Sequence, residues 1–536
     1  MSMMNNGIAG MNAASLSLMV TSSNIANASV QGYSRQQAVY TTTATGSVYV
    51  SDVKRITDDF YISQVQQSST ALGYSTVYAS QAGILEQTLS SDSMSLSPVL
   101  NDFFQSLNAA QADPMDPAYR QQILADSGNL AAQFNMLSGK LDDQFGSIDT
   151  QMTTMVSEAN TLMNQLADLN NEIMKQEAAG GASPHLLDQR DQAVSQLSEL
   201  VGVDVVYQKN NTVDLFLPNG EPLVVGGNAS ELVLVPGSPD SSMTQVGLKN
   251  GDSTKVLRDV GGAVQAQMDF RDDVLIPARQ ELDRMALVLV DAINSQLAEG
   301  YDLNGDSGSP LFGDINGSDA MRNRSTSSPD NSGSGVLEVE ISDSTALTAE
   351  NYSIVIGKDG TPIVTTEPGG ENVEYKMTED GVISFDGVTI SLGEGTLEPG
   401  DSFYIEPGKG AAADMEVVMT DIDKLAFSSD PDEPGNNENL LALAGIQDEA
   451  LVGGSLTING AYSALVVDVA GKSASAMTDY EASAMIYQNA NNNLLSVAGV
   501  NMDEEASSLI VFQQAYAANA KVIAAADEMF NLLLGL

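Results

Sequence analysis

The sequence predicts an α+β multidomain protein, in which a helical trunk and terminal coiled-coil helices from both chain ends carry inserted antiparallel β domains. Three observations predict this class. Apolar residues recur at 3-4 spacing near both ends of the chain, as in the seam of a coiled coil. A longer row with the same spacing lies in the first half. Two stretches switch to the alternation of strands, and because helix flanks both, we expect them to loop out of one trunk.

Both chain ends predict helices that pack on a partner helix. In the first segment, apolar and small residues keep the 3-4 spacing, and no charged residue precedes Arg35. The last segment keeps a 3.5-residue repeat, which holds one seam toward a neighbouring helix. The two rows are Met4, Ile8, Met11, Ser15, Leu18, Ser22 and Ile25, and Leu509, Phe512, Tyr516, Asn519, Ile523, Ala526, Phe530 and Leu533. Each end is therefore the natural partner of the other.

The composition of these rows also predicts contacts with neighbouring subunits. Ser15, Ser22, Asn519 and Ala526 are small or polar seam residues, so an isolated pair of helices would bury little apolar surface. We therefore interpret both ends as an assembly interface. Its expected residues are Ile8, Met11, Leu18, Ile25, Leu509, Phe512, Tyr516, Ile523, Phe530 and Leu533.

Helices are expected to dominate the first two hundred residues, and residues 41–201 are assigned to the helical trunk. Ser97-Pro98 and Ser183-Pro184 each place proline after a capping residue, where a helix needs no N–H donor, so both should open helices. Between them, residues 141–173 keep the 3-4 spacing for roughly nine turns at 3.6 residues per turn. This row stops near Gly180 and predicts one long helix within a bundle.

A second trunk helix is expected over residues 187–201, and the apolar period then changes to two at Gly202. Alternating residues flank Lys209-Asn210-Asn211, and Pro218-Asn219-Gly220 supplies the next turn, so antiparallel strands are predicted. Helix is expected to return from about 264 to 297, where Pro277 should kink or divide it.

Residues 317–335 are rich in Ser, Asn, Asp and Gly and predict a linker. Short alternating strands follow it, which indicates a small all-β domain. The expected strands are 336–341, 352–356, 382–385, 388–392 and 403–405. From Ala411 the helical period is expected to resume and to last to Leu536.

These elements predict a chain of several domains, as its 536 residues require. A terminal helical assembly domain combines both ends, a trunk combines three helical stretches, and two β domains are inserted. The expected bounds are 1–40 and 500–536 for the terminal domain, 41–201, 264–300 and 411–499 for the trunk, 202–263 for the β insertion, and 336–407 for the outer β domain.

Charge and composition exclude several functions. The formal net charge of −49 would repel a nucleic-acid backbone. No run approaches eighteen apolar residues, so no membrane span is expected. The N-terminus lacks the features of a secretory signal, so an exported protein would use another route. With one histidine and no cysteine, the chain has neither a Cys-His pair nor a multi-histidine zinc site.

Four local features are interpreted as structural, so no catalytic residue, metal site or cofactor is predicted. Asp188, Arg190 and Asp191 are expected to form solvated pairs on an exposed helix. The stretch from Asp302 begins like a calcium loop but lacks its glycine and its final glutamate, so it predicts a polar turn. Gly471-Lys472-Ser473 falls in predicted helix and lacks the earlier glycine of a phosphate loop. His185 follows a helix-opening proline and is expected to be exposed.

Motifs at both ends resemble the axial proteins of the bacterial flagellum, which include the rod, hook and hook-associated families. The N-terminal motifs are Asn24-Ile25-Ala26-Asn27 and Gly32-Tyr33-Ser34-Arg35. The C-terminal ones run from Gly499 to Glu505 and from Gln513 to Ile523. Within this group, the 186–191 and 294–308 segments and the strand at Asp401-Ser402-Phe403 are similar to the hook-associated proteins that join hook to filament. The chain departs slightly, with Ser23 and Gln31 where the family often has Asn and Pro.

This resemblance implies a mechanical role outside the cell. Members are expected to leave through the flagellar type III apparatus and to build a tube in which the terminal helices lie innermost. The implied partners are identical subunits in a ring, hook protein, a filament-side hook-associated protein and a flagellar export chaperone. A charge-poor first segment can stay disordered until it meets its neighbours and then fold on binding.

Two other interpretations stay open. One is another flagellar axial subunit such as hook protein, although the long helix before residues 186–191 favours the junction type. The other is a secreted adhesin that binds through its β domains. Imaging of cells that carry a deletion separates these, since hooks without filaments indicate the junction role.

Overall fold

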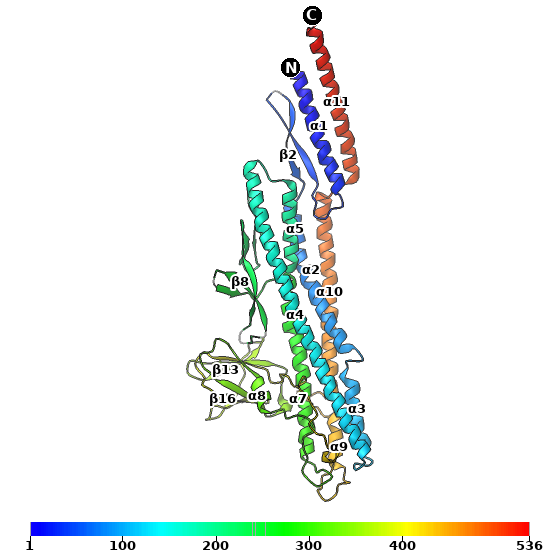
Figure 1. Ribbon diagram of the computed structural model, residues 1–536, viewed down its shortest axis with the longest axis vertical. Helices are drawn as coiled ribbons and strands as arrows, with labels where there is room; N and C mark the ends of the chain where they lie inside the picture. The colour runs from blue at the N-terminus through cyan, green and yellow to red at the C-terminus, as the bar shows by residue number, and fades with distance from the viewer. Residues whose placement is uncertain (1, 45, 238–239, 242, 252, 535–536) are drawn as a thin grey trace.

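The computed structural model describes residues 2–44, 46–237, 240–241, 243–251 and 253–534. The molecule is a long rod with the helical trunk along its axis, and both chain ends lie together at one end of it (Figure 1). The β sheets of the two inserted regions lie on one side of the trunk. This is the α+β arrangement that the sequence predicts.

Long helices form the trunk. Its core spans one continuous cluster of buried apolar residues along the rod. The trunk helices are α2 (Asp59–Ser90), α3 (Leu96–Ala110), α4 (Pro117–Ala179), α5 (Pro184–Leu200), α6 (Gly262–Phe270), α7 (Ile276–Ala298), α9 (Glu438–Gly445) and α10 (Ile458–Ala498). The longest, α4, has 63 residues and is therefore about 95 Å long at 1.5 Å per residue.

The ends of α4 follow from local chemistry. Asp116 precedes Pro117 and accepts a hydrogen bond from the Ala118 N–H, which caps the helix start. Gly180 ends the helix with a φ of +129°, a conformation that side-chain-bearing residues rarely adopt. The helix therefore ends where the sequence predicts, but it begins well before residue 141.

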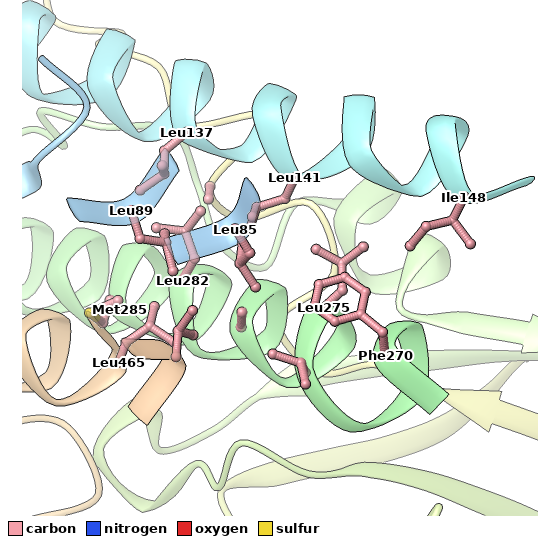
Figure 2. Packing of buried hydrophobic residues seen from close by; sticks show 14 of the residues in the cluster. Leu85, Leu89, Leu137, Leu141, Ile148, Phe270, Leu275, Leu282, Met285 and Leu465 are labelled. Carbon is pink, nitrogen blue, oxygen red and sulfur yellow. The ribbon is translucent and has the colours of Figure 1, made fainter. Parts of the chain in front are cut away.

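Four helices share the centre of the trunk. Figure 2 shows side chains from α2, α4, α7 and α10 interleaving around one apolar core, with Phe270 and Leu275 beside them. The residues labelled there from these four helices are Leu85 and Leu89, Leu137, Leu141 and Ile148, Leu282 and Met285, and Leu465. This packing joins segments that lie almost 400 residues apart in the sequence.

Pro277 divides the predicted 264–297 helix as expected. A π turn, η1 (Arg271–Leu275), separates α6 from α7, and Pro277 lies in the first turn of α7. Because proline has no N–H, the α-helical bond to residue 273 cannot form, and the chain widens by one residue there.

The first β region forms two antiparallel sheets against α4. The strands are β3 (Asp204–Tyr207), β4 (Val213–Phe216), β5 (Pro222–Val225) and β6 (Asn228–Ala229) in one sheet, and β7 (Glu231–Pro236), β8 (Thr244–Asn250) and β9 (Ser253–Val256) in the other. The Asn170 amide of α4 exchanges two hydrogen bonds with the backbone of Val213, at 2.7 and 3.0 Å. This amide anchors the first sheet to the trunk.

The outer β region consists of two four-stranded sheets around a small apolar core of its own. The strand orders are β10-β17-β12-β13 and β11-β16-β15-β14. The strands are β10 (Ser325–Ser327), β11 (Val336–Ile341), β12 (Asn351–Ile356), β13 (Pro362–Glu367), β14 (Lys376–Met377), β15 (Ile383–Phe385), β16 (Val388–Glu394) and β17 (Ser402–Ile405). All five strands that the sequence predicts in this region are present.

Four predictions about elements were wrong. Residues 36–55 form a hairpin of β1 (Gln36–Thr42) and β2 (Val48–Arg55), not helix. The helix α3 begins at Leu96 with Ser95 as its cap, so Ser97-Pro98 lies inside its first turn. The stretch predicted as a linker contains the short helix α8 (Ser318–Asn323) and strand β10.

The fourth error concerns the chain after Ala411. Within residues 411–437 the only helical turn is the 3-10 turn Ile422–Lys424, and regular helix returns with α9. The segment instead lies in the trunk core through Phe427 and Leu425, whose carbonyl accepts a hydrogen bond from the buried Arg120 guanidinium at 2.9 Å. The apolar residues of this segment are therefore explained by burial of single side chains in the core, and they do not indicate a helix.

Candidate assembly interface and its joint with the trunk

The two chain ends pair as antiparallel helices, α1 (Ser2–Asn27) and α11 (Met502–Leu534) (Figure 1). Gly7 faces Ile523 and Gly10 faces Asn519. A Cβ atom added at Gly7 would lie 2.8 Å from Ile523 Cγ1, and one at Gly10 would lie 2.5 Å from Asn519 Oδ1. The absence of side chains at these two positions therefore lets the helices approach closely.

The side of α1 that is buried in the chain consists mainly of small residues, with Val20 at 8 % exposure the largest apolar one. Ala13, Ala14, Ser17, Thr21 and Asn24 are each at most 5 % exposed. The larger residues predicted for the interface point elsewhere: Ile8 is exposed, whereas Met11, Leu18 and Ile25 are half-buried. The helix thus has two faces, one that packs within the chain and one that stays open.

On α11 the predicted row and the inward face largely coincide. Leu509, Phe512 and Ile523 are half-buried, whereas Tyr516 and Phe530 are 41 % and 54 % exposed. With Ile523 opposite Gly7 in an antiparallel pair, Phe530 falls beyond the first turn of α1, and Figure 1 shows α11 extending past its partner. The Leu533 side chain lies outside the described residues.

The β1–β2 hairpin covers α1 beside the helical pair. The Tyr40 hydroxyl hydrogen-bonds the Ser17 hydroxyl, and near the hairpin tip Ser47 donates to the Asn6 side chain. A groove of about 490 Å³ remains between the hairpin tip and the two helices, lined in part by Gly10, Val48 and Phe512. The hairpin therefore adds an open, partly apolar surface to the terminal helices.

A buried polar cluster fixes the base of the helical pair. The Asn24 side chain bonds both the N–H and the C=O of Gln36 at 2.9 Å and donates to Glu505 Oε2 at 3.1 Å. Arg35 Nε donates to Glu505 Oε1 at 2.7 Å, and the Tyr33 hydroxyl donates to Asn24 Oδ1 at 2.9 Å. Because Asn24 and Glu505 are only 1 % and 2 % exposed, these bonds satisfy groups that water cannot reach.

The electrostatics of this cluster favour its charged pair. Burial lowers the pKa of Arg35, but the carboxylates of Glu504 and Glu505 outweigh burial, and the net pKa of the guanidinium is raised. Burial raises the pKa of the Tyr33 hydroxyl. The arginine therefore stays charged and tyrosine stays neutral, which suits their roles as donors.

A second buried cluster ties the hairpin to α5. Arg55 at the end of β2 contacts Asp188 at 3.0 Å and Asp191 at 2.6 Å, and the Ser34 N–H donates to Asp188 Oδ2 at 3.2 Å. Arg190 contacts Asp191 at 2.6 Å. Together the two clusters form what we call the joint: Asn24, Tyr33, Ser34, Arg35, Arg55, Asp188, Arg190, Asp191 and Glu505.

The prediction of a solvated, exposed helix at residues 188–191 was wrong. Asp188 is 7 % exposed and Arg190 is 2 % exposed, and the Arg190 guanidinium lies over the Tyr207 ring at 5.3 Å. Burial raises the pKa of Asp188 despite the hydrogen bonds from Ser34 and Arg55. The two N-terminal motifs, the start of α11 and the 186–191 segment converge here, and sequence reasoning did not bring them together.

The joint connects parts of the chain that lie far apart in the sequence. Among the described residues, no group of three or more His, Cys, Asp or Glu side chains is placed to hold a metal ion. Asp302 accepts the N–H groups of Asn304 and Asp306 and pairs with Lys424 at 3.1 Å, which makes the predicted polar turn. Lys472 lies in helix α10, and His185 is exposed. None of the described helices combines the length and apolar character that a membrane crossing requires.

Comparison with known protein families matches three separate parts of the chain. Three family models match: "Flagellar hook-associated protein FlgK helical domain" over residues 82–312, "Flagellar hook-associated protein 1, D2-like domain" over 326–407, and "Flagellar basal body rod FlgEFG protein C-terminal" over 491–536. The first two cover most of the trunk and the outer β region. The third covers the end of α10 and all of α11.

Two relatives match along their full length. The chain is 33 % identical over 556 residues to flagellar hook-associated protein 1 of Escherichia coli (strain K12) and 34 % identical over 561 residues to that of Salmonella typhimurium, with 100 % of each chain covered. A solved structure of the flagellar hook junction protein FlgK from Burkholderia pseudomallei shares the fold, with a TM-score of 0.73 at 21 % identity. It covers 81 % of this chain and 100 % of that one.

Proposed function

The chain belongs to the flagellar hook-associated protein 1 family, and from this membership we propose that it joins hook to filament as a structural subunit that assembles through its terminal helices. The observation that carries the proposal is the open surface of the α1–α11 pair. Ile8, Ile510, Val511 and Phe530 are between 38 % and 59 % exposed in a chain with a net charge of −49. Such a surface is typical of an interaction site, and we propose that neighbouring subunits cover it.

The joint supports a mechanical role. It links the helical pair to the hairpin and the hairpin to α5 through buried charged and polar groups, so the terminal helices have a defined orientation on the trunk. A junction must transmit torque between two lattices, and a pair of helices on a loose tether would not do so. We infer that the joint holds the assembled terminal helices at a fixed angle to the trunk.

The partners follow from this role. We propose that identical subunits form a ring through α1 and α11, with hook protein on one side and a filament-side hook-associated protein on the other. The chain would reach this extracellular position through the flagellar type III apparatus, with an export chaperone covering the open apolar helices beforehand. The predicted terminal domain at residues 1–40 and 500–536 remains part of this proposal.

A deletion of the gene with complementation tests the proposal. Cells without the chain should carry hooks that lack filaments, and the full chain should restore filaments. Gold-labelled chain on isolated flagella should form one band between hook and filament. Label along the whole hook would favour another axial subunit, and unchanged filaments in the deletion would exclude the junction role.

A further inference from the structure

One side of α7 attaches the outer β region, and the connection at residues 406–412 that follows its last strand, to the trunk. The contacts recur at every fourth residue of the helix, and we call the residues that make them the docking row: Arg279, Asp283, Leu287 and Asp291. At 3.6 residues per turn this row lies within about 120° of the helix circumference and extends over about 18 Å. Its contacts are the ion pair of Arg279 with Glu406 at 3.1 Å, the hydrogen bond from the Ala412 N–H to Asp283 at 2.9 Å, the burial of Leu287 in the outer core, and the hydrogen bond from the Ser344 hydroxyl to Asp291 at 2.5 Å.

Each side of this contact has a core of its own. Among the described residues, Leu287 is the one that α7 supplies to the core of the outer β region. Other side chains of α7, such as Leu282 and Met285, point into the trunk core (Figure 2). The Asn135 amide of α4 donates to the Ala412 carbonyl at 2.8 Å and so fixes the end of the connection on the trunk. A release of the outer β region from the docking row would therefore pivot near residue 412 and leave both cores intact.

Asp283 is a buried carboxyl in the middle of this contact. It is 4 % exposed, and among the described residues it forms no ion pair. The neighbouring Arg279 is paired with Glu406, which also binds Lys409 at 2.5 Å. The cavity beside Asp283 has a volume of about 20 Å³, which is room for about one water molecule. An ionised Asp283 would therefore lose its hydration without gaining a cation in contact, which is unfavourable.

The charges around Asp283 come from both sides of the contact. They are Arg279, Glu281 and Arg284 of α7, Asp142 of α4, Glu350 before β12, and Glu406 and Lys409 of the connection. Burial raises the pKa of Asp283 to about 7; the Ala412 N–H and Arg279 oppose this shift, whereas Glu406 and Asp142 add to it. The electrostatics thus agree with the geometry that the docked state favours the neutral carboxyl.

We propose that a proton on Asp283 holds the outer β region on the docking row, and that loss of this proton near neutral pH lets the region release from α7. Release brings the carboxylate into contact with water. The released form gives up the proton near pH 4, whereas the docked form keeps it up to about pH 7. Docking is therefore most favourable below about pH 4, weakens as pH rises to about 7, and stays constant above that. This switch belongs to the single chain and does not depend on the proposed function.

Hydrogen exchange of the purified full-length chain at pH 5, 6 and 7 tests the release, with each exchange rate divided by its intrinsic rate at that pH. Protection of residues 344–351 and 406–412 should fall together, by roughly fifty-fold between pH 5 and pH 7, while α4 and α10 stay better protected. Protection that does not change with pH would overturn the proposal. So would exchange of the two segments only together with α4 and α10, because the opening would then be global unfolding.

Two variants of the docking row identify the group that titrates. Asp283→Asn keeps an acceptor for the Ala412 N–H but has no proton to lose, so protection of both segments should no longer change between pH 5 and pH 7. Asp291→Asn alters the other carboxylate of the row and is the matched control. It should lower protection at every pH and keep the roughly fifty-fold fall. A fall that persists in Asp283→Asn, or one that disappears in Asp291→Asn, would contradict the assignment to Asp283.

Discussion

At the scale of single residues, the joint depends on charges that have been removed from water. Arg55 faces two carboxylates, and its own side chain and that of Asp188 are 10 % and 8 % exposed. Burial disfavours each charge alone, and the pair is tolerated because its members compensate each other. Sequence reasoning could quote Asp188 and Arg190 as a motif. It could not place Arg55 beside them, because 133 residues separate Arg55 from Asp188.

Replacing Arg55 with Ala should therefore weaken the joint. Two buried carboxylates would lose their cation. The free energy needed to open the hairpin should therefore fall by roughly 3 kcal/mol. Native-state hydrogen exchange over residues 28–55 measures this. Arg322→Ala removes an exposed arginine that also pairs with two glutamates, and it should leave exchange unchanged. Equal exchange rates in the two variants would show that the contacts of Arg55 do not stabilise the hairpin.

A second residue-scale prediction concerns Asp283 in α7. Burial raises its pKa to about 7, although the Ala412 N–H donates to it at 2.9 Å and the charge of Arg279 opposes the shift. The folded chain then keeps this proton up to about pH 7, whereas the unfolded chain releases it near pH 4. The contribution of Asp283 to the free energy of unfolding is therefore largest below about pH 4. It falls as pH rises to about 7 and stays constant above that.

Asp283→Asn should remove this dependence, because an amide oxygen still accepts the Ala412 bond without carrying charge. The variant should be more stable than the parent at pH 8, by up to roughly 4 kcal/mol, and the difference should shrink toward pH 4. Denaturant unfolding at pH 5, 6.5 and 8 gives the comparison. A difference that is the same at all three values would contradict the raised pKa.

At the scale of elements, a helix or strand could be predicted where many residues repeat one spacing of apolar side chains. The long helix α4 repeats its 3-4 spacing over many turns, and the strands near residues 204–216 are bounded by clear turn residues. Both were predicted. The β1–β2 hairpin was missed because only Ala38 of β1 is buried, so its strands show little alternation. On α1 the most buried residues are mainly small, whereas the large predicted residues are half-buried or exposed, so the predicted apolar row does not mark the side that packs within the chain.

The α1–α11 pair gives the prediction at this scale. Ile523→Asp places a carboxylate opposite Gly7, where desolvation is unfavourable. The trunk has its own core, so the variant should fold with an unchanged melting temperature but fail to enter flagella. Immunoblots of isolated flagella measure incorporation, with Met136→Asp as the control. Incorporation of Ile523→Asp at the parental level would argue against the terminal interface.

At the scale of the whole molecule, charge opposes assembly and apolar surface drives it. A net charge of −49 repels other copies over the Debye length, which is about 8 Å at physiological salt. The net charge follows from the composition alone. The positions of the open apolar surfaces required the structure, because the same residue types also fill the core.

Raising the salt concentration should therefore promote self-association of the purified chain. Screening shortens the range of repulsion and leaves the apolar attraction in place. Sedimentation velocity at 20 mM and 500 mM sodium chloride measures the change, and the weight-average mass should rise. The Ile523→Asp variant serves as a matched control, since its weight-average mass should rise less. A mass that falls with salt would mean that charge pairs hold copies together.

The most direct test of the central claim is hydrogen exchange at the two chain ends in the free and the assembled states. The buried side of α1 consists mainly of small residues, and Glu505 is the only buried residue among the described side chains of α11, so both terminal helices should exchange fast in the free monomer while the trunk exchanges slowly. In isolated flagella, α1 and α11 should become as protected as the trunk. Ends that are already protected in a proven monomer, or that stay unprotected after incorporation, would contradict assembly through the terminal helices.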